Sequence, residues 1–259
     1  SKNQLLYAIQ DSVLSPKPED IQDVNTPNVM ANNITLKAEA GGIGIDGDAK
    51  PISYAELNNE TNLKILANAK AGDLTWGTDG VIVQQQQAIY VKVNEGGEVN
   101  VTGRDNVYLA GVKDTKLDIN DIETDGDIRL QGDKGVYVDY LKGNDLIIVG
   151  GTGDIMSSAN KGNYVHTDLN GSIEATADGN IYLSTEDSAI NKDLKILLLA
   201  AGKETNLAAT GSILMENVKG STAQSRINAN VINLEAGGTI GTSDTAIRIL
   251  DNGAVVNAD

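Results

Sequence analysis

Acidic side chains at alternating positions are the first feature of this chain that suits a chemical task. Residues 121, 123, 125 and 127 are Asp, Glu, Asp and Asp, and Gly126 stands at the sixth position, as in a calcium-binding EF-hand loop. Position twelve of such a loop is a bidentate Glu, whereas this chain has Gly132, and the flanking segments have strand patterns. We therefore expect a solvated acidic corner and keep a calcium site as the lesser alternative, with candidates Asp121, Asp125 and Asp127.

A second glycine-rich segment has a weaker calcium pattern. Gly41 to Asp46 matches the opening of the calcium-binding nonapeptide of repeat-in-toxin proteins, in which turn carbonyls and an Asp bind the ion between stacked turns. Asp48 occupies the position where that motif has a large apolar residue, and no tandem copy follows. A plain turn is the favoured interpretation, with Asp46 and Asp48 as minor calcium candidates, and we predict no cofactor.

His166 is the only histidine, so any Ser-His-Asp triad must use it. Its neighbours have the pattern of a strand or turn and lack a nucleophile elbow, and the sequence contains no phosphate-binding glycine loop with Lys and no dinucleotide fingerprint. We expect a structural histidine and no enzyme activity. An active site assembled sideways from stacked strands stays open, because sequence distance says little about neighbours in a solenoid.

A few aromatic side chains at outward strand positions form the candidate binding surface. Aromatic rings combine contact area with a polar tip, which suits recognition of a sugar or a protein, although scattered strand aromatics more often serve local packing. The candidates are Trp76, Tyr90, Tyr108, Tyr137 and Tyr182.

The composition limits what kind of core and partner the chain can have. Hydrophobic residues make up 40% of the 259 residues, but aromatics only 3%, with no Phe, so the core must be aliphatic. The formal charge of -16 opposes phosphate backbones and anionic headgroups, which argues against nucleic acid as a partner. No apolar run approaches the roughly 18 residues of a membrane span, so we expect no membrane insertion.

One short phrase recurs along the chain: Gly, a small polar residue, then two aliphatic residues separated by any residue. It predicts a turn that leads into a short strand with alternating side chains. Strand starts fall roughly eight to eleven residues apart, and alternate starts about 18 or 19 apart. The predicted starts are Val99, Val107, Leu117, Ile128, Val136, Leu146, Ile155, Tyr164, Ile173 and Ile181.

This period predicts an all-β fold, a right-handed parallel β-helix of roughly eleven coils over residues 31–259. Residues 1–30 are expected to be a cap or leader segment. A sandwich has no reason to repeat one phrase at near-constant intervals, and no later segment keeps a helical period. We expect glycines to supply left-handed backbone at the corners, and asparagines to stack into amide ladders. The candidates for the ladders are Asn33, Asn106, Asn180, Asn206 and Asn230.

Two distant segments, residues 33–44 and 230–241, align with each other through a strand, a Gly-Gly pair and an Ile-Gly. The second continues into Ala246-Ile247-Arg248-Ile249. These phrases resemble the coils of large secreted bacterial adhesins of the filamentous haemagglutinin type, including leukotoxin-like filamentous adhesins. The amino-terminal secretion signature of that family, an Asn-Pro-Asn-Leu type motif, is not found, and Pro27-Asn28-Val29 is at best a fragment of it.

The resemblance implies a protein at the surface of a Gram-negative bacterium, exported by a two-partner route through an outer-membrane transporter. It implies a role as an extended β-helical shaft in host-cell attachment, with a host cell-surface protein or glycan as partner. Two alternatives stay open: a β-helix carbohydrate-active enzyme, either a polysaccharide lyase or a glycosidase, and a calcium-stabilised repeat-toxin module.

Overall fold

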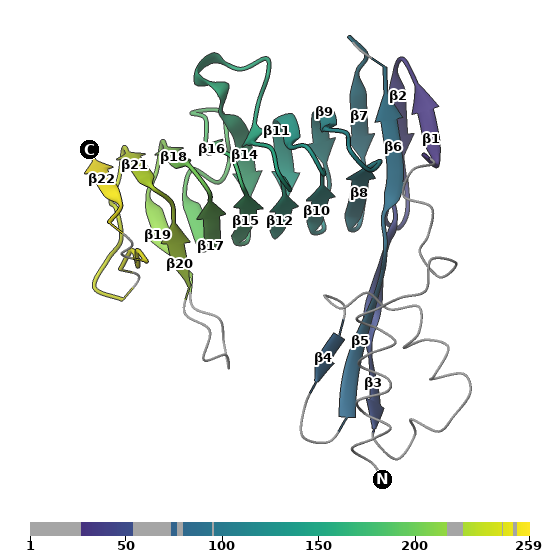
Figure 1. Cartoon of the computed structure of the whole chain (residues 1–259), viewed down its shortest axis with the longest axis horizontal. Coiled ribbons are helices and arrows are strands. Elements are labelled where there is room, and N and C mark those ends of the chain that lie inside the picture. The colour runs from purple at the N-terminus through teal and green to yellow at the C-terminus, as the bar shows by residue number, and fades with distance from the viewer. Residues whose placement is uncertain are drawn as a thin grey trace. The chain divides into compact units, whose positions relative to one another are not determined.

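The computed structural model describes residues 27–53, 74–76, 80–94, 96–216, 225–244, 246–250 and 253–259 (Figure 1). The chain divides into two compact units. The larger comprises Thr26–Ile43 and Ile89–Asp259, and the smaller has its described residues between Gly44 and Ala88. The predicted cap or leader lies almost wholly outside the described residues.

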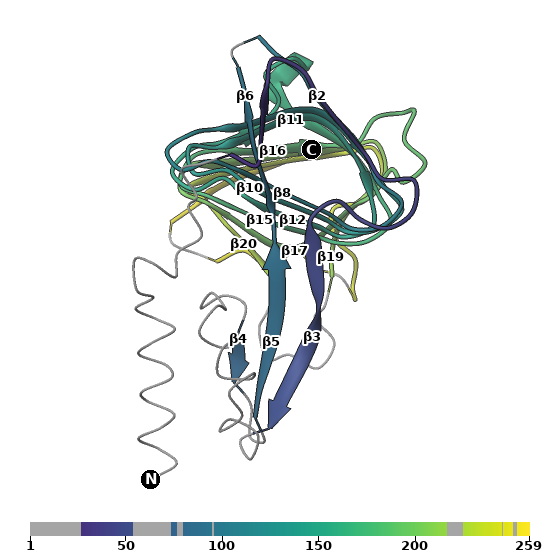
Figure 2. The ribbon, with the colours of Figure 1, turned by 90° about the vertical axis from the view of Figure 1, so that its right-hand side faces the viewer.

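The larger unit is a parallel β-helix built from two sheets. Apart from β21 and β22, strands that pair with each other in a sheet are not consecutive in the chain, because the chain mostly alternates between the two sheets as it winds. Figure 2 shows successive coils lying over one another. Sheet A contains β1 (Val29–Ala31), β6 (Ile89–Val93), β8 (Val107–Gly111), β10 (Ile128–Gln131), β12 (Leu146–Val149), β15 (Ile173–Ala177), β17 (Leu194–Ala201), β19 (Ile213–Met215) and β20 (Arg226–Asn228). Sheet B contains β2 (Ile34–Lys37), β7 (Val99–Thr102), β9 (Leu117–Glu123), β11 (Val136–Gly143), β13 (Ile155–Met156), β14 (Val165–Leu169), β16 (Ile181–Ser184), β18 (Glu204–Ala209), β21 (Val231–Ala236) and β22 (Val255–Ala258). A short 3-10 helix, η4 (Lys161–Asn163), interrupts the coil between β13 and β14.

In-register pairing stacks aliphatic side chains into columns inside the coil. One column of sheet A is fully buried through six successive coils. Because equivalent aliphatic residues of successive coils stack on one another, each coil buries its side chains against those of the coil before it. The column consists of Leu109, Leu130, Ile148, Ala175, Leu199 and Ile227.

The predicted parallel β-helix and its strand starts are confirmed. Nine of the ten predicted starts begin a strand, and the tenth differs by one residue, since β14 begins at Val165 and not at Tyr164. The described strands form sheets of nine and ten members, so the solenoid has about nine to ten coils where the sequence predicted eleven.

The smaller unit accounts for the lower number of coils, because its strands interrupt the predicted solenoid. Its strands β3 (Ile45–Ser53), β5 (Gly80–Gln87) and β4 (Leu74–Trp76) form an antiparallel sheet and contribute nothing to sheets A and B. The chain therefore leaves the solenoid after Ile43 and resumes it at Ile89. A recurring strand phrase predicts strands, but it does not say which sheet they join.

Side-chain oxygens at the corners tie each coil to the next. The residue just before a strand accepts a hydrogen bond from the backbone N–H of the equivalent residue one coil later. Asp145 Oδ1 accepts from Ser172 N at 2.6 Å, and Asp193 Oδ1 accepts from Ser212 N at 2.6 Å. We call these residues the corner acceptors: Asn33, Asn106, Asp127, Asp145, Asp154, Asp193 and Ser212.

The glycine of the recurring phrase stands beside a corner acceptor. A Cβ at Gly171 would overlap the Asp145 carboxylate, and one at Gly211 would overlap that of Asp193. Neither glycine has a positive φ, so the expected left-handed backbone is wrong for them. These glycines are needed because the previous coil's side chain occupies the space of a β-carbon.

We expect Gly171→Ala to cost about 2–3 kcal/mol of stability, because the new methyl group displaces Asp145 from its bonds to Ser172. Asp145→Ala alone should cost about 1.5–3 kcal/mol. The double variant should cost less than the sum by about 1–2 kcal/mol, since the two changes damage one contact. Urea unfolding of the four proteins measures this.

Gly96→Ala serves as the matched control, because its Cβ would meet nothing within 4 Å and its φ of 74° brings only local strain. The stability cost of Gly96→Ala should add to that of Asp145→Ala, because the two residues share no contact. Full additivity of Gly171→Ala with Asp145→Ala would contradict the close-approach explanation.

Candidate binding surface

The outer face of sheet B carries a row of polar and aromatic side chains in register. Pairing places Tyr182 beside Asn206, Asn206 beside Asn233, and Asn233 beside Asn257. We call these four residues the tyrosine–asparagine row. They share the row because outward positions alternate with inward ones along each strand, so register alone sets their neighbours.

Hydrogen bonds run along the row from coil to coil. Asn257 Nδ2 donates to Asn233 Oδ1 at 2.7 Å, and Asn233 Nδ2 donates to Asn206 Oδ1 at 2.7 Å. Asn233 Nδ2 also donates to Glu204 Oε1 at 2.7 Å, and the Tyr182 hydroxyl donates to Glu204 Oε2 at 3.3 Å. Four coils thus share one polar network, and the predicted ladder through Asn206 is confirmed.

The other predicted ladder asparagines serve the corners. Asn33 and Asn106 are corner acceptors, while Asn180 donates to Asp154 Oδ1. Asn230 Nδ2 donates to the Gly202 carbonyl at 3.0 Å. These amides bind backbone or carboxylate groups of the neighbouring coil, whereas Asn206 bonds to the side chain of another asparagine, Asn233.

Tyr164 lies beside the row and was not among the candidate binding residues. It follows η4, and its ring meets that of Tyr182 edge to face, with centroids 5.9 Å apart. Burial raises the pKa of the Tyr164 hydroxyl, and the carboxylates of Glu235 and Glu204 raise it further. Burial and Glu204 likewise raise the pKa of Tyr182. Both phenols therefore stay protonated well above neutral pH and keep a hydrogen to donate.

A hollow of about 210 Å³ opens beside Tyr164. Half-buried Asn233 and exposed Asn257 line it from the row, and exposed Glu235 lines it from the next outward position. Its described lining contains no Lys or Arg. The hollow is smaller than the roughly 300–1,000 Å³ of sites for drug-sized ligands, so it matches one ring-sized group.

A second outward row of sheet B contains the only histidine. His166 pairs in register with Tyr140 on one side and Ser184 on the other. Ser184 Oγ lies 2.9 Å from His166 Nδ1, and Glu186 Oε1 lies 3.4 Å from Nε2. A Ser, a His and a Glu thus meet, but the buried Ser184 sits within a strand and its contact with His166 follows from coil stacking.

The buried carboxylate of Asp168 anchors the turn after β16. It accepts hydrogen bonds from Asn191 N at 2.9 Å, from Asn191 Nδ2 at 3.0 Å and from Ile190 N at 3.2 Å. Burial by itself would raise the pKa of Asp168, but these hydrogen bonds outweigh it and the pKa is lowered. Asp168 therefore stays ionised and holds the turn against sheet B.

The residues of the two candidate calcium motifs lie in different elements. Asp46 and Asp48 lie in β3 of the smaller unit, whereas Asp121 is exposed on β9. Asp125 is an exposed turn residue, and Asp127 is a corner acceptor that also receives Asn144 Nδ2 at 2.7 Å. Among the described residues, no three His, Asp or Glu side chains group closely enough to hold a metal ion.

The four tyrosine candidates are divided between the two sheets of the larger unit. Tyr90 and Tyr108 lie on sheet A, with only 6% and 4% of their surface exposed, while Tyr137 and Tyr182 are half-buried on sheet B. Trp76 lies in β4 of the smaller unit. The strip was predicted from outward positions alone, but consecutive strands belong to different sheets, so outward side chains on them face different sides.

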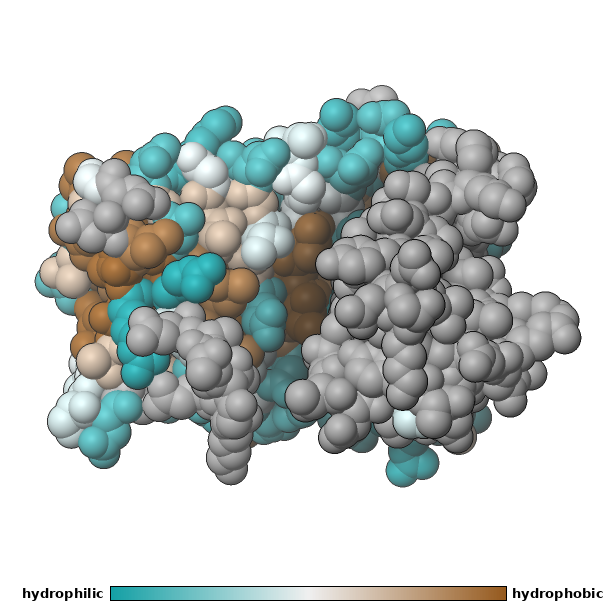
Figure 3. Space-filling model, turned by 60° about the horizontal axis from the view of Figure 1, so that its bottom comes forward, coloured by the Kyte–Doolittle hydropathy of each residue, from teal (hydrophilic) through white to brown (hydrophobic). Residues whose placement is uncertain are grey.

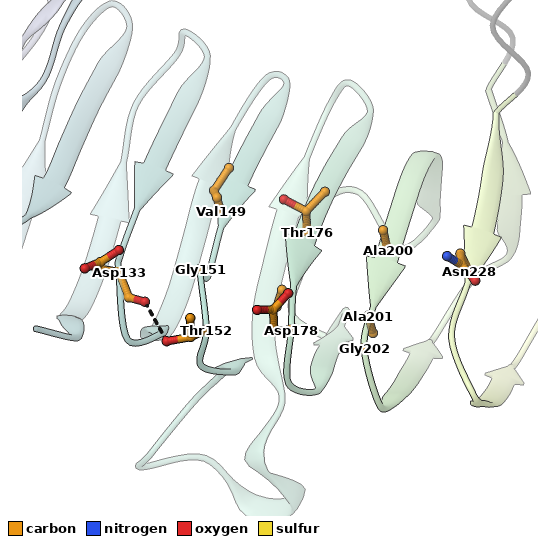
Figure 4. A pocket seen from close by; sticks show the side chains of 11 residues that line it. Asp133, Val149, Gly151, Thr152, Thr176, Asp178, Ala200, Ala201, Gly202 and Asn228 are labelled. Atoms are coloured by element: carbon orange, nitrogen blue, oxygen red, sulfur yellow. Dashed lines mark hydrogen bonds between the residues drawn. The ribbon is translucent and has the colours of Figure 1, made fainter. Parts of the chain in front are cut away.

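Sheet A has an outer face of a different kind. Apolar side chains occupy several of its outward positions, and Figure 3 shows hydrophobic residues gathered together on the surface. An open groove of about 530 Å³ crosses successive coils at the carboxyl ends of the sheet A strands and the turns that follow them (Figure 4). Its lining consists mainly of small residues, together with Asp133 and Asp178. Thr152 Oγ1 donates to the Asp133 carbonyl at 3.1 Å in this groove.

The chain matches no protein-family model, no curated protein and no solved structure at a significant level. The fold is therefore established by the two parallel sheets themselves, and the resemblance to filamentous haemagglutinin-type adhesins stays a prediction from sequence. In the part of the chain that the structure describes, no helix has the length and apolar character needed to cross a membrane.

We expect Asn233→Ala to cost about 1–3 kcal/mol, because it leaves Asn206, Glu204 and Asn257 each without one hydrogen bond. Asn257→Ala removes one bond at the exposed end of the network and should cost about 0.5–1 kcal/mol. Urea unfolding checks the difference, and equal costs would show that the row does not act as a network.

Asp121→Asn should raise the melting temperature at neutral pH. Although Asp121 is exposed, partial loss of solvent raises its pKa, and the nearby carboxylates of Asp139, Glu123 and Glu98 raise it further, so the ionised form is disfavoured in the folded state. As the pH falls through this raised pKa, the wild type gains stability, until the unfolded chain is protonated too. The gain from the substitution should therefore shrink in acid.

Asp125→Asn, at an exposed turn position, controls for the change in net charge. Thermal melts of the three proteins from neutral to acidic pH make the comparison. A gain for Asp121→Asn that persists unchanged in acid would rule out carboxylate repulsion as its cause.

Proposed function

We propose that this chain is part of a secreted surface adhesin of a Gram-negative bacterium, in which the solenoid is an extended shaft that presents binding surfaces to host cells. The observation that carries the proposal is the continuous pairing of successive coils in both sheets. Each coil adds about 4.8 Å to a structure held together by backbone hydrogen bonds, so length grows without a larger core.

The chemistry of the surface supports the proposal. Outward positions of sheet B carry polar and aromatic side chains in rows that run from coil to coil, a pattern suited to contact along an extended partner. The charge of -16 and the absence of Cys suit an exported protein that must stay soluble and needs no oxidative folding step. A host cell-surface protein or glycan is the proposed partner, and an outer-membrane transporter the proposed export route.

Beads coated with the folded protein should bind to cultured epithelial cells several times more often than beads coated with albumin. Beads that carry the same amount of heat-unfolded protein control for the charge and composition of the chain. Microscopic counting of bound beads gives the readout. Binding no greater than that of either control would count against an attachment function.

A further inference from the structure

The outer face of sheet A carries two rows of side chains that run from coil to coil in register. Figure 4 shows Val149, Thr176 and Ala200 of one row on successive strands. We call the two rows together the sheet A face: Arg129, Ile147, Glu174 and Leu198 in the first row, and Gln131, Val149, Thr176 and Ala200 in the second. All of these side chains are half-buried except Gln131, which is exposed. The face ends at β8, because Tyr108 and Ala110 at the equivalent positions are only 4% and 2% exposed.

Two opposite charges flank an aliphatic residue in the first row. Arg129 and Glu174 lie one coil to either side of Ile147. Two coil spacings separate the charged residues by about 10 Å, which is too far for a direct ion pair. Glu174 has Leu198 as its other neighbour in the row, and among the described residues its carboxylate forms no ion pair and no side-chain hydrogen bond. A cation placed opposite this carboxylate would therefore be attracted to it.

We propose that two copies of the larger unit associate through the sheet A face, in antiparallel orientation, about a two-fold axis that runs along β12. This rotation reverses the order of the coils and keeps each row opposite its equivalent. Ile147 then meets Ile147 of the second copy, and Arg129 meets Glu174 of the second copy at two symmetric places. The inference concerns self-association and does not depend on host attachment.

The charges select this arrangement over its neighbours. An axis along β10 would set Arg129 against its own copy, and an axis along β15 would do the same for Glu174. A parallel arrangement, with the axis along the solenoid, would set both residues against their copies. An axis between β12 and β15 would set Glu174 against Ile147. Like charges in contact strongly disfavour association, whereas an axis along β12 brings opposite charges together.

The second row suits the same arrangement. Val149 meets its own copy on the axis, and Thr176 meets Gln131 of the second copy. A hydroxyl and an amide each have a donor and an acceptor, so this pair forms a hydrogen bond in either direction. At the margin, Leu198 comes opposite Tyr108 of the second copy, a ring that lies under the Arg129 guanidinium at 5.2 Å. The centre of the interface is therefore apolar and its surroundings are polar, as in other protein interfaces.

The size of the sheet A face sets the expected strength of the association. Strands β10 and β12 have four residues each, so three to five facing strands cover only about 200–300 Å². Stable complexes bury about 800 Å² on each partner. We therefore expect weak, reversible association, with a Kd of roughly 0.1–1 mM. The charge of -16 opposes association at low salt, so the measurement needs physiological salt, where the Debye length is about 8 Å.

Cross-linking through a single introduced cysteine tests the orientation, because the chain has no cysteine of its own. Val149→Cys places a thiol on the proposed axis, so a short bismaleimide should link two copies of the full chain. Thr176→Cys is the matched control: it lies one coil away in the same row, and its two copies would be two coils apart. It should link slowly to itself but rapidly to Gln131→Cys in a mixture of the two proteins.

Charge reversal tests the pairing. In the Val149→Cys background, Arg129→Glu and Glu174→Arg should each slow cross-linking at least about tenfold, because like charges then face each other. A mixture of these two variants should cross-link nearly as fast as the parent, since each supplies the charge that the other needs. Both substitutions in one chain should restore the rate as well. Damage to the fold cannot be repaired by mixing, so the mixture separates pairing from misfolding.

Lys142→Glu, at a half-buried position of β11 in sheet B, controls for the change in net charge and should leave the rate unchanged. Circular dichroism melts check that every variant is folded, and if Arg129→Glu does not fold, Glu174→Arg and the cysteine pairs decide. Sedimentation of the unmodified protein should show a mass that rises with concentration. A monomer at all concentrations, self-linking of Thr176→Cys as fast as that of Val149→Cys, or a mixture that stays slow would overturn the proposal.

Discussion

The hydrogen bond from a corner side chain to the backbone of the next coil is the interaction on which this structure depends. Backbone hydrogen bonds join the strands and parts of the turns, but some N–H groups at the corners would otherwise lack partners. Asp145, Asp193 and the other corner acceptors satisfy those groups in the following coil. The same bond sets register, because it joins equivalent positions of successive coils.

Register explains both the inside and the outside of the solenoid. Inside, it stacks aliphatic residues such as Leu130 and Ile148 into one buried column. Outside, it aligns Asn206, Asn233 and Asn257 so that three separate amides become one network. A binding surface on such a molecule is therefore a property of several coils together, and a substitution in one coil is felt through its neighbours.

Much of the candidate surface was out of reach of sequence reasoning, for a geometric reason. Asn206 and Asn233 are 27 residues apart, while Asn233 and Asn257 are 24 apart, so no single period aligns them. Tyr164 was predicted only as a strand start, whereas it precedes β14 and directly follows the short helix η4. The one available signal was the Asn-aliphatic pattern shared by Asn206 and Asn233, each flanked by residues that alternate inward and outward.

The amino-acid sequence by itself determined the class of fold, the aliphatic core and almost every strand start from Val99 to Ile181, because those depend on local alternation and on turn residues. Only the tertiary structure decided which strands share a sheet, where the chain leaves the solenoid, and which outward side chains meet. It placed Tyr108 and Tyr137 on different sheets, and it placed β3, β4 and β5 in a separate antiparallel sheet. Those outcomes depend on coil length and pairing partners, which are long-range choices that no local pattern encodes.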